Sequence, residues 1–129
     1  MKILSKKQVC ILHSALIAVS GGSDGIRDEG LLDSALSAPF QSFGGTQQYT
    51  SLQAKAARLG FGIIKNHPFV DGNKRIGSFL LLLYLSAHKV QLSNITNESL
   101  VALALLVAQS NPTDKDIIIK LVINLISQD

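Results

Sequence analysis

The sequence predicts a compact all-α domain, and three observations support that fold class. Apolar residues recur at helical spacing over most of the chain. Capping residues and turn residues separate these stretches at short intervals, so about six helices fit into the chain. Of the 129 residues, 47% are hydrophobic, which is enough for one substantial core in a single domain over residues 1–129.

The first predicted helix begins at Ser5, which forms a capping box with Gln8, and ends at the glycine pair 21–22. His13 lies on or near the apolar face of this helix, which favours a core or boundary histidine over a catalytic one. Cys10 has no partner base and no metal-ligand spacing, so we interpret it as a packing residue. As the single cysteine it excludes an internal disulfide and fits a reducing cytosol.

A loop then leads to Asp28, which can cap a second, short helix that Pro39 closes. Arg27, in this loop, either contacts a ligand or ties the loop to the body of the domain, and we favour the structural role. Residues 40–49 follow without helical periodicity, so they form a loop or a short hairpin with its turn at the glycine pair 44–45. The aromatic residues in this segment could dock a partner chain or pin the loop, and the sequence leaves both open.

Residues 50–53, Thr-Ser-Leu-Gln, form a second capping box and open a helix that carries Gly60 and Gly62 in its interior. A glycine inside a helix costs about 1 kcal/mol relative to alanine, so it usually marks the close approach of another backbone. Gly77 in the next helix is the expected counterpart. We therefore expect these two helices to cross tightly and to hold the loop around His67 rigid between them.

The remaining sequence completes the bundle without a membrane span. The Leu-rich segment 79–85 ends near His88, a helix-end residue, and its run of about a dozen residues is shorter than the ~20 that a bilayer requires. Thr96 opens an almost wholly apolar helix, and residues 113–116 form a third capping box. The last helix covers the core from outside. Its polar stripe is Asp116, Lys120, Asn124 and Ser127, and its apolar residues are Ile117, Ile118, Leu121, Val122 and Leu125.

The charge pattern indicates a local anion site rather than a nucleic-acid interface. The net charge of +3 is too small to indicate nucleic acid, and neither a recognition helix nor a wider basic stripe is visible. The basic residues cluster in the central part of the chain, where Asp71 is the acidic residue that opposes them. The clustered cations are Lys55, Arg58, Lys65, Lys74 and Arg75.

The central stretch, residues 66–75, places polar chemistry at the start of a helix that must be buried. A helix start offers unpaired N–H groups and the positive end of the helix dipole, and Gly72 permits the positive φ that forms an anion-binding nest. Free imidazole titrates near neutral pH, so His67 can act as a general base, while Asp71 offers a hard oxygen ligand for Mg²⁺. The candidate phosphate ligands are Asn73, Lys74 and Arg75.

A base, a metal carboxylate and an anion cradle together predict phosphoryl or nucleotidyl transfer. The chain has neither a Walker A pattern nor a kinase-type Gly-rich loop, so it would carry out this chemistry by a different arrangement. The alternative is an N-capped helix in which Asp71 and Asn73 satisfy backbone donors and the two cations are solvated. A histidine–aspartate metal hydrolase is a further alternative, but a second ligand cluster is lacking.

Residues 67–75, His-Pro-Phe-Val-Asp-Gly-Asn-Lys-Arg, resemble the Fic-family signature H-x-F-x-[DE]-G-N-[GK]-R. Residues 25–36 resemble the death-on-curing (Doc) branch of that family, and the resemblance covers essentially the whole chain. It implies a Fic-type helical fold in which His67 deprotonates a target hydroxyl, Asp71 holds Mg²⁺ and Phe69 anchors the loop. The residues implied to bind the phosphates of ATP are Gly72, Asn73, Lys74 and Arg75.

Two positions favour phosphoryl transfer over adenylyl transfer. Adenylylating Fic enzymes commonly have glycine at the position of Lys74 and a second arginine at the position of Ser78. The Doc branch implies that ATP binds in the reversed sense and that its γ-phosphoryl group passes to a threonine of elongation factor Tu, which blocks translation. Adenylyl transfer is the second interpretation.

The resemblance also implies a toxin with a separate antitoxin. An inhibitory segment of the form [ST]-x-x-x-E-[GN] does not occur in this sequence, so an antitoxin would lie over the active-site groove. A non-catalytic interaction module with the same fold is the rival interpretation, and the complete set of site residues argues against it. We expect a cytoplasmic protein whose partners include neither nucleic acid nor a membrane.

Overall fold

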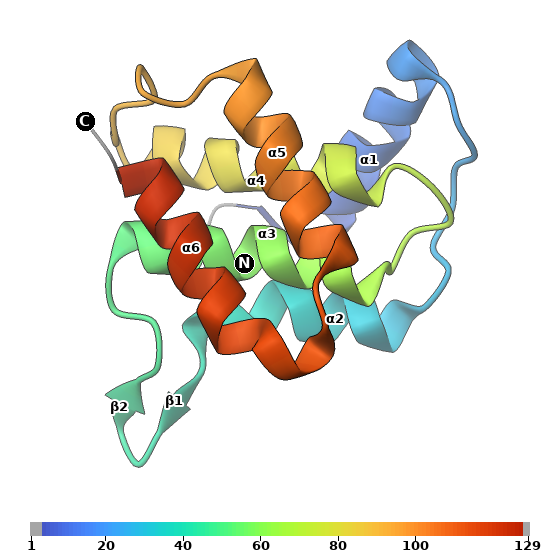
Figure 1. Ribbon diagram of the computed structural model, residues 1–129. Helices are drawn as coiled ribbons and strands as arrows, with labels where there is room; N and C mark the ends of the chain where they lie inside the picture. Colours follow the sequence, from blue (N-terminus) through green and yellow to red (C-terminus); the bar gives the residue numbers. More distant parts are fainter. Residues whose placement is uncertain (1–3, 128–129) are drawn as a thin grey trace.

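The computed structural model describes residues 4–127 of the chain. Within this range it contains six α-helices and one small antiparallel hairpin, which confirms the predicted all-α fold class (Figure 1). None of the helices in the described range is both long and apolar enough to cross a lipid bilayer. The elements are α1 (Lys6–Ser20), α2 (Glu29–Ser37), the 3₁₀-helix η1 (Ala38–Phe40), β1 (Ser42–Phe43), β2 (Thr46–Gln47), α3 (Leu52–Asn66), α4 (Asn73–Ala87), α5 (Asn97–Gln109), the 3₁₀-helix η2 (Pro112–Asp114) and α6 (Lys115–Ser127).

Helix α3 runs through the middle of the molecule, and α2, α4, α5 and α6 pack around it (Figure 1). Most of its residues are buried on every side, as expected for a central helix rather than an amphipathic surface helix. Helix α4 adds a second set of fully buried side chains, and α1 packs against α4. The loop between α3 and α4 therefore starts and ends on the two most deeply embedded helices.

Two glycines allow α3 and α4 to cross closely. A Cβ atom at Gly60 would lie 3.4 Å from the carbonyl oxygen of Gly77, and one at Gly77 would lie 3.3 Å from the carbonyl oxygen of Gly60. A Cβ at Gly77 would also lie 2.7 Å from Cγ1 of Ile64, which is closer than real Cβ contacts allow. The predicted tight crossing is confirmed. Gly62 faces α2 instead, because its Cβ would lie 3.3 Å from Ala35.

Three predicted helix starts are confirmed and two are shifted. Helix α3 is capped by Ser51, which accepts a hydrogen bond from a backbone N–H three residues on, and not by Thr50. Before α6 the capping residue is Asn111, which starts η2 and accepts a hydrogen bond from the N–H of Thr113 at 3.1 Å. The third predicted capping box therefore does not form. The confirmed N-caps are Ser5, Asp28 and Thr96.

Helix α6 packs on the core through part of its apolar surface. Of the apolar residues named from the sequence, Ile118 and Val122 are buried, whereas Ile117, Leu121 and Leu125 are 62%, 43% and 38% exposed. Consecutive apolar residues cover more than one side of this helix, so the sequence alone does not single out the side that faces the core. The polar stripe was correct, since its residues are exposed. The residues that α6 does bury are Ile118, Ile119, Val122 and Ile126.

The segment between η1 and α3 forms a short hairpin, which is one of the two alternatives that the sequence left open. Strand β1 pairs with β2, and Gly44 and Gly45 make the turn at φ of 58° and 82°. The hairpin extends away from the helical body (Figure 1). Phe40 is half-buried against the core, whereas Phe43 on the hairpin is 66% exposed. One phenylalanine therefore packs the base of the segment, and the other is presented to solvent.

Candidate active site

The loop that links α3 to α4, residues 67–72, has a left-handed backbone conformation at both ends. His67 ends α3 with φ 53° and ψ 52°, and Gly72 precedes α4 with φ 75° and ψ 19°. The positive φ predicted for Gly72 is confirmed. His67 carries a Cβ atom, so its conformation costs about 1–2 kcal/mol, which surrounding contacts must offset.

Asn73 holds this loop from the inside. Its side chain is buried, and the N–H of Phe69 donates to its Oδ1 at 3.0 Å while its Nδ2 donates to the Phe69 carbonyl at 3.0 Å. The Phe69 ring is itself 1% exposed, in agreement with its expected role as an anchor. Both ends of the Asn73 carboxamide are used within the loop. Phosphate binding by this residue stays a prediction, and its backbone N–H fits that role better than its side chain.

Arg27 holds the loop from the other side. Its Nε donates to the carbonyl of His67 at 2.6 Å, and its Nη2 donates to the carbonyl of Asn66 at 2.9 Å. The backbone N–H groups of Arg27 and Asp28 both donate to the carbonyl of Pro68, at 2.7 and 3.0 Å. A cation at the C-terminal end of a helix also interacts favourably with the helix dipole. The favoured structural role of Arg27 is confirmed, and its contacts offset strain at His67.

The Asp71 carboxylate is held by backbone N–H groups from two loops. Gly72 donates to Oδ1 at 2.8 Å, and Ser23, in the loop after α1, donates to Oδ2 at 3.2 Å. These two hydrogen bonds lower the pKa of the Asp71 carboxyl below its ordinary value of 3.8, and the Arg75 guanidinium lowers it further. The side chain is 50% exposed, so an ionised carboxylate with unused lone pairs faces solvent.

A magnesium ion fits this donor set as a ligand of one carboxylate. Within residues 4–127 no group of three or more His, Cys, Asp or Glu side chains could hold a metal ion. Mg²⁺ does not need such a cage, because it usually takes one or two carboxylates and completes its shell with phosphate oxygens and water. Asp71 would hold the ion together with the phosphates of a bound nucleotide.

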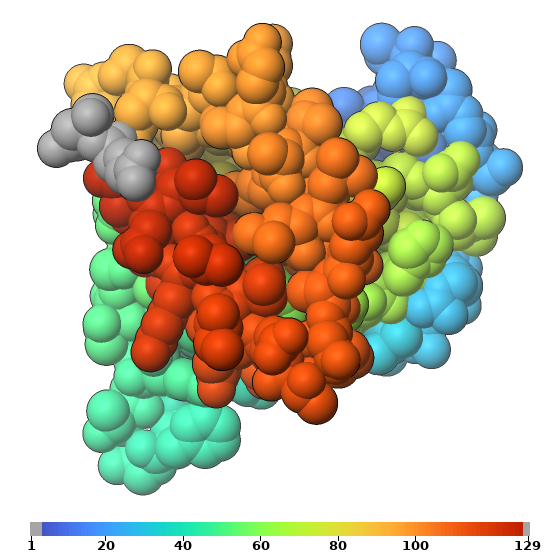
Figure 2. All heavy atoms as spheres, viewed as in Figure 1, coloured from blue at the N-terminus to red at the C-terminus, as the bar shows by residue number. Residues whose placement is uncertain are grey.

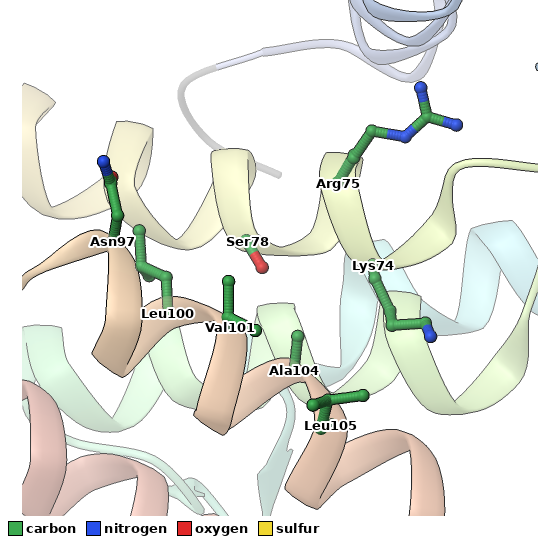
Figure 3. Close-up of a pocket in the computed structure, with 8 residues that line it drawn as sticks. All are labelled: Lys74, Arg75, Ser78, Asn97, Leu100, Val101, Ala104 and Leu105. Atoms are coloured by element: carbon green, nitrogen blue, oxygen red, sulfur yellow. The ribbon is translucent and has the colours of Figure 1, made fainter. Parts of the chain in front are cut away.

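Helix α4 starts with two cations that point in different directions. Within the described residues no side chain caps α4, which leaves its first-turn N–H groups available to an anion. The Arg75 guanidinium donates to the hydroxyl of Ser20 and, at 2.7 Å, to the carbonyl of Gly21 at the end of α1. Lys74 is exposed and points toward α5 instead (Figure 3). Lys74 is therefore the cation more readily available to a phosphate.

All six predicted site residues line one hollow of about 260 Å³. In Figure 2 the yellow-green atoms of the loop lie at the surface, between the orange of α5 and the blue end of α1. The loop that lines the hollow is thus exposed on this face of the molecule. The lining residues of the hollow are Ile64, His67, Asp71, Gly72, Asn73, Lys74, Arg75 and Ala108.

A second hollow of about 450 Å³ adjoins the first and shares Lys74 and Arg75 with it. It lies between α4 and α5, and side chains from both helices point into it (Figure 3). Its lining is mainly apolar, so it suits a flat, weakly polar group attached to an anion in the first hollow. Besides the two shared cations, it is lined by Ser78, Asn97, Leu100, Val101, Ala104 and Leu105.

The wider cluster of cations predicted from the sequence does not form. The ammonium group of Lys55 is buried and donates to the carbonyl of Tyr49 at 2.5 Å and to Gln47 at 3.2 Å, so it holds the base of the hairpin. Lys65 donates to the carbonyl of Ser110. Arg58 lies over the ring of Phe61, at 5.6 Å from its centre. The prediction was wrong for these three because proximity in sequence does not fix the side of a helix that a cation occupies.

The structure also brings a residue to the loop that the sequence assigned to the core. His13 in α1 is 1% exposed, and its Nε2 lies 2.7 Å from the carbonyl oxygen of Asp71. Its ring stacks on Phe69 with 3.9 Å between ring centres. The core location was predicted correctly, but the contact with the loop spans 58 positions of sequence and leaves no local signal.

Comparisons with known proteins agree with the geometry of the site. A family model described as "Fic/DOC family" matches residues 3–85, which include the whole of the loop. The protein named "Toxin Doc" from Mycolicibacterium smegmatis is 40% identical over 73 residues, which are 57% of this chain and 56% of that protein. The match therefore spans about half the length of that relative.

Proposed function

The chain belongs to the Fic/DOC family, and from this membership we propose that it transfers the γ-phosphoryl group of ATP to a hydroxyl side chain of a target protein. The observation that carries the proposal is the convergence of an imidazole, an ionised carboxylate and a helix start with a lysine on one open hollow. These groups match the requirements of phosphoryl transfer, which is catalysed mainly by positioning and charge stabilisation.

In the proposed reaction the target hydroxyl oxygen attacks the γ-phosphorus, and the bond from that phosphorus to the bridging oxygen of ADP breaks. His67 accepts the hydroxyl proton, which is the task that its exposed imidazole can perform. The first-turn N–H groups of α4 and the Lys74 ammonium hold the phosphate oxygens. Asp71 would hold Mg²⁺, which when bound neutralises charge on the phosphates. Arg75 would either bind phosphate as well or keep its contact with α1.

The adjoining hollow favours phosphoryl over adenylyl transfer. Ser78 lies within its mainly apolar lining, where a further cation would be needed to bind additional phosphates. A nucleoside fits this lining better than a pyrophosphate tail does, since the cations of the lining, Lys74 and Arg75, are the two that it shares with the first hollow and the rest of it is mainly apolar. With the nucleoside there, the γ-phosphate is the end of ATP that reaches His67.

We further propose that the protein is a toxin that blocks translation. The similarity to the protein named Toxin Doc supports this, and elongation factor Tu is the target that we propose. A separate antitoxin would restrain the chain by covering the active-site groove. Expression of the chain alone should then arrest bacterial growth, and expression of His67→Ala should not. Harmless expression of a folded wild-type chain would contradict the toxin proposal.

ATP labelled separately at the α- and γ-phosphates tests the reaction. The purified chain, Mg²⁺ and a bacterial lysate should give a protein labelled from the γ position only, and purified elongation factor Tu should be labelled in the same way. His67→Ala should lower the rate by about 10²–10⁴-fold, the usual contribution of a general base. Lys120→Ala, on the outer face of α6, is the matched control and should leave the rate unchanged.

Each other result has a defined meaning. Label from the α position would show adenylyl transfer and would contradict the orientation inferred from Ser78 and the apolar hollow. No label from either position in lysate or on elongation factor Tu, with the chain folded, would contradict the transfer reaction and favour a non-catalytic module.

A further inference from the structure

The strongest feature outside the proposed machinery is the contact between α1 and the carbonyl of Asp71. His13 is 1% exposed, and its ring lies parallel to that of Phe69, with an angle of 10° between the planes and 3.9 Å between the centres. The imidazole is therefore fixed by packing on the anchor of the loop. From this position its Nε2 reaches the Asp71 carbonyl oxygen at 2.7 Å.

The direction of this hydrogen bond follows from the acceptor. A carbonyl oxygen can only accept, so the proton must be on Nε2 of His13. The other ring nitrogen, Nδ1, faces Oδ1 of Asp24 at 3.5 Å. That carboxylate is engaged by the hydroxyl of Ser14 at 2.9 Å and by the N–H of Gly25 at 2.8 Å. Asp24 therefore has two closer donors, and the shorter of the two His13 contacts is the one to the loop.

We propose that His13 is a positioning residue for the active site, which orients the Asp71 carboxylate by holding the Asp71 carbonyl. The Asp71 carbonyl and the Gly72 N–H, which donates to the Asp71 carboxylate, belong to one peptide unit, so rotation of that unit would move both. Without the Nε2 donor the carbonyl would lie beside a buried ring with no hydrogen bond, a costly arrangement that the loop could relieve by turning. The carboxylate would then lose the hydrogen bond from Gly72 and with it one of the two backbone donors that orient it.

This proposal deepens the proposed function, because it rests on Asp71 as the ligand of the divalent ion. Two variants distinguish this positioning role of His13 from a role in packing alone. His13→Phe keeps an aromatic ring stacked on Phe69 and removes the donor. His13→Gln removes the ring but keeps an amide N–H, since its Nε2 lies about as far from Cβ as Nε2 of histidine does.

Binding of Mn²⁺ in the presence of ATP, followed by electron paramagnetic resonance, gives a readout that does not depend on transfer. His13→Phe should weaken Mn²⁺ binding about 10-fold or more, the usual effect of removing a group that orients a metal ligand. His13→Gln should keep most of the wild-type affinity for Mn²⁺, even if this variant is less stable than His13→Phe. Asp71→Ala is the reference for complete loss of the ion.

Three results would overturn the proposal. The first is equal Mn²⁺ affinity in the wild type and His13→Phe, and the second is equal loss in both His13 variants in proportion to their stability. The third is a wild-type ¹H–¹⁵N spectrum of the imidazole with the proton on Nδ1 alone. Failure of the wild type itself to bind Mn²⁺ with ATP would instead contradict the role of Asp71 in the proposed function, and the positioning role with it.

Discussion

His67 has a backbone conformation that only glycine adopts without strain, with φ of 53°. The hydrogen bond from Arg27 to the carbonyl of His67 stabilises this conformation. We predict that the free energy of unfolding of His67→Gly is about 1 kcal/mol larger than that of His67→Ala, so the glycine variant is the more stable. Glycine removes the strain that a Cβ atom causes at this φ, and alanine does not. Urea denaturation of the two variants measures the difference. Both should be inactive in phosphoryl transfer, so equal stability would show that the backbone strain is absent.

Asp71 should make the stability of the fold depend on acid pH. The hydrogen bonds from Gly72 and Ser23 lower the pKa of its carboxyl below 3.8 in the folded protein. Such a group stabilises the fold fully above its unfolded pKa, and the stabilisation is lost as the pH falls through the lower folded pKa. Asp71→Asn should thus be less stable than the wild type at pH about 6, and the gap should begin to close only as the pH falls below about 4. A gap that stays constant between urea titrations at pH about 6 and at pH about 2 would contradict this cause.

The crossing of α3 and α4 is the element-scale feature on which the site depends. Gly77→Ala places a Cβ atom 2.7 Å from Cγ1 of the buried Ile64, so either this side chain or the crossing of the two helices must shift. Overpacking of this kind costs about 1–3 kcal/mol, and alanine regains up to about 1 kcal/mol in helix propensity. We expect a net loss of about 1–2 kcal/mol in the free energy of unfolding, together with slower phosphoryl transfer.

Gly30→Ala is the matched control for this prediction. Gly30 lies in α2, and its Cβ would meet only Oδ1 of Asp28, at an ordinary distance of 3.5 Å. The same chemical change should there raise the free energy of unfolding by up to about 1 kcal/mol. If both variants were stabilised to the same extent, α3 and α4 would not be in the close contact that the structure shows.

At the scale of the whole molecule, local patterns were the reliable part of the sequence. Caps at Ser5, Asp28 and Thr96, the hairpin turn and the glycine crossing all depend on residues a few positions apart or on backbone space that only glycine leaves. The motif itself located the hollow, since its residues are contiguous. Failures occurred where the outcome depended on packing. Lys55 and Lys65 donate to backbone carbonyls in other segments, and α6 buries only part of its apolar surface.

The two residues that hold the loop, His13 and Arg27, illustrate the same limit. Arg27 reaches the carbonyl of His67 across 40 positions, and His13 reaches that of Asp71 across 58. The sequence correctly placed one in the core and one in a structural role, but it could not pair either with the loop. Such pairings are set by the way in which α1 and the loop after it pack beside α4, which has no periodic signature.

The last two helices lie beyond the matched residues 3–85, yet they pack directly on the central helix. Helices α5 and α6 contact α3, and Ala108 of α5 lines the active-site hollow. Burial of each aliphatic side chain stabilises a fold by about 1.5–3 kcal/mol, so the six aliphatic side chains that these two helices bury contribute ~9 kcal/mol or more. That approaches the ~5–15 kcal/mol by which a whole domain is stable. The buried aliphatic side chains of the two helices are Leu103, Val107, Ile118, Ile119, Val122 and Ile126.

We therefore predict that a chain ending at Ile95 does not fold, although it keeps every residue of the motif. Removal of α5 and α6 exposes the side of the central helix α3 that these two helices cover in the intact protein. The shortened chain should show no cooperative thermal transition by circular dichroism, and it should bind a dye that detects exposed apolar surface. It should also fail to bind Mn²⁺ with ATP. A cooperative transition in this chain would mean that α1 to α4 form a core of their own, and that α5 contributes only to the hollows beside Lys74.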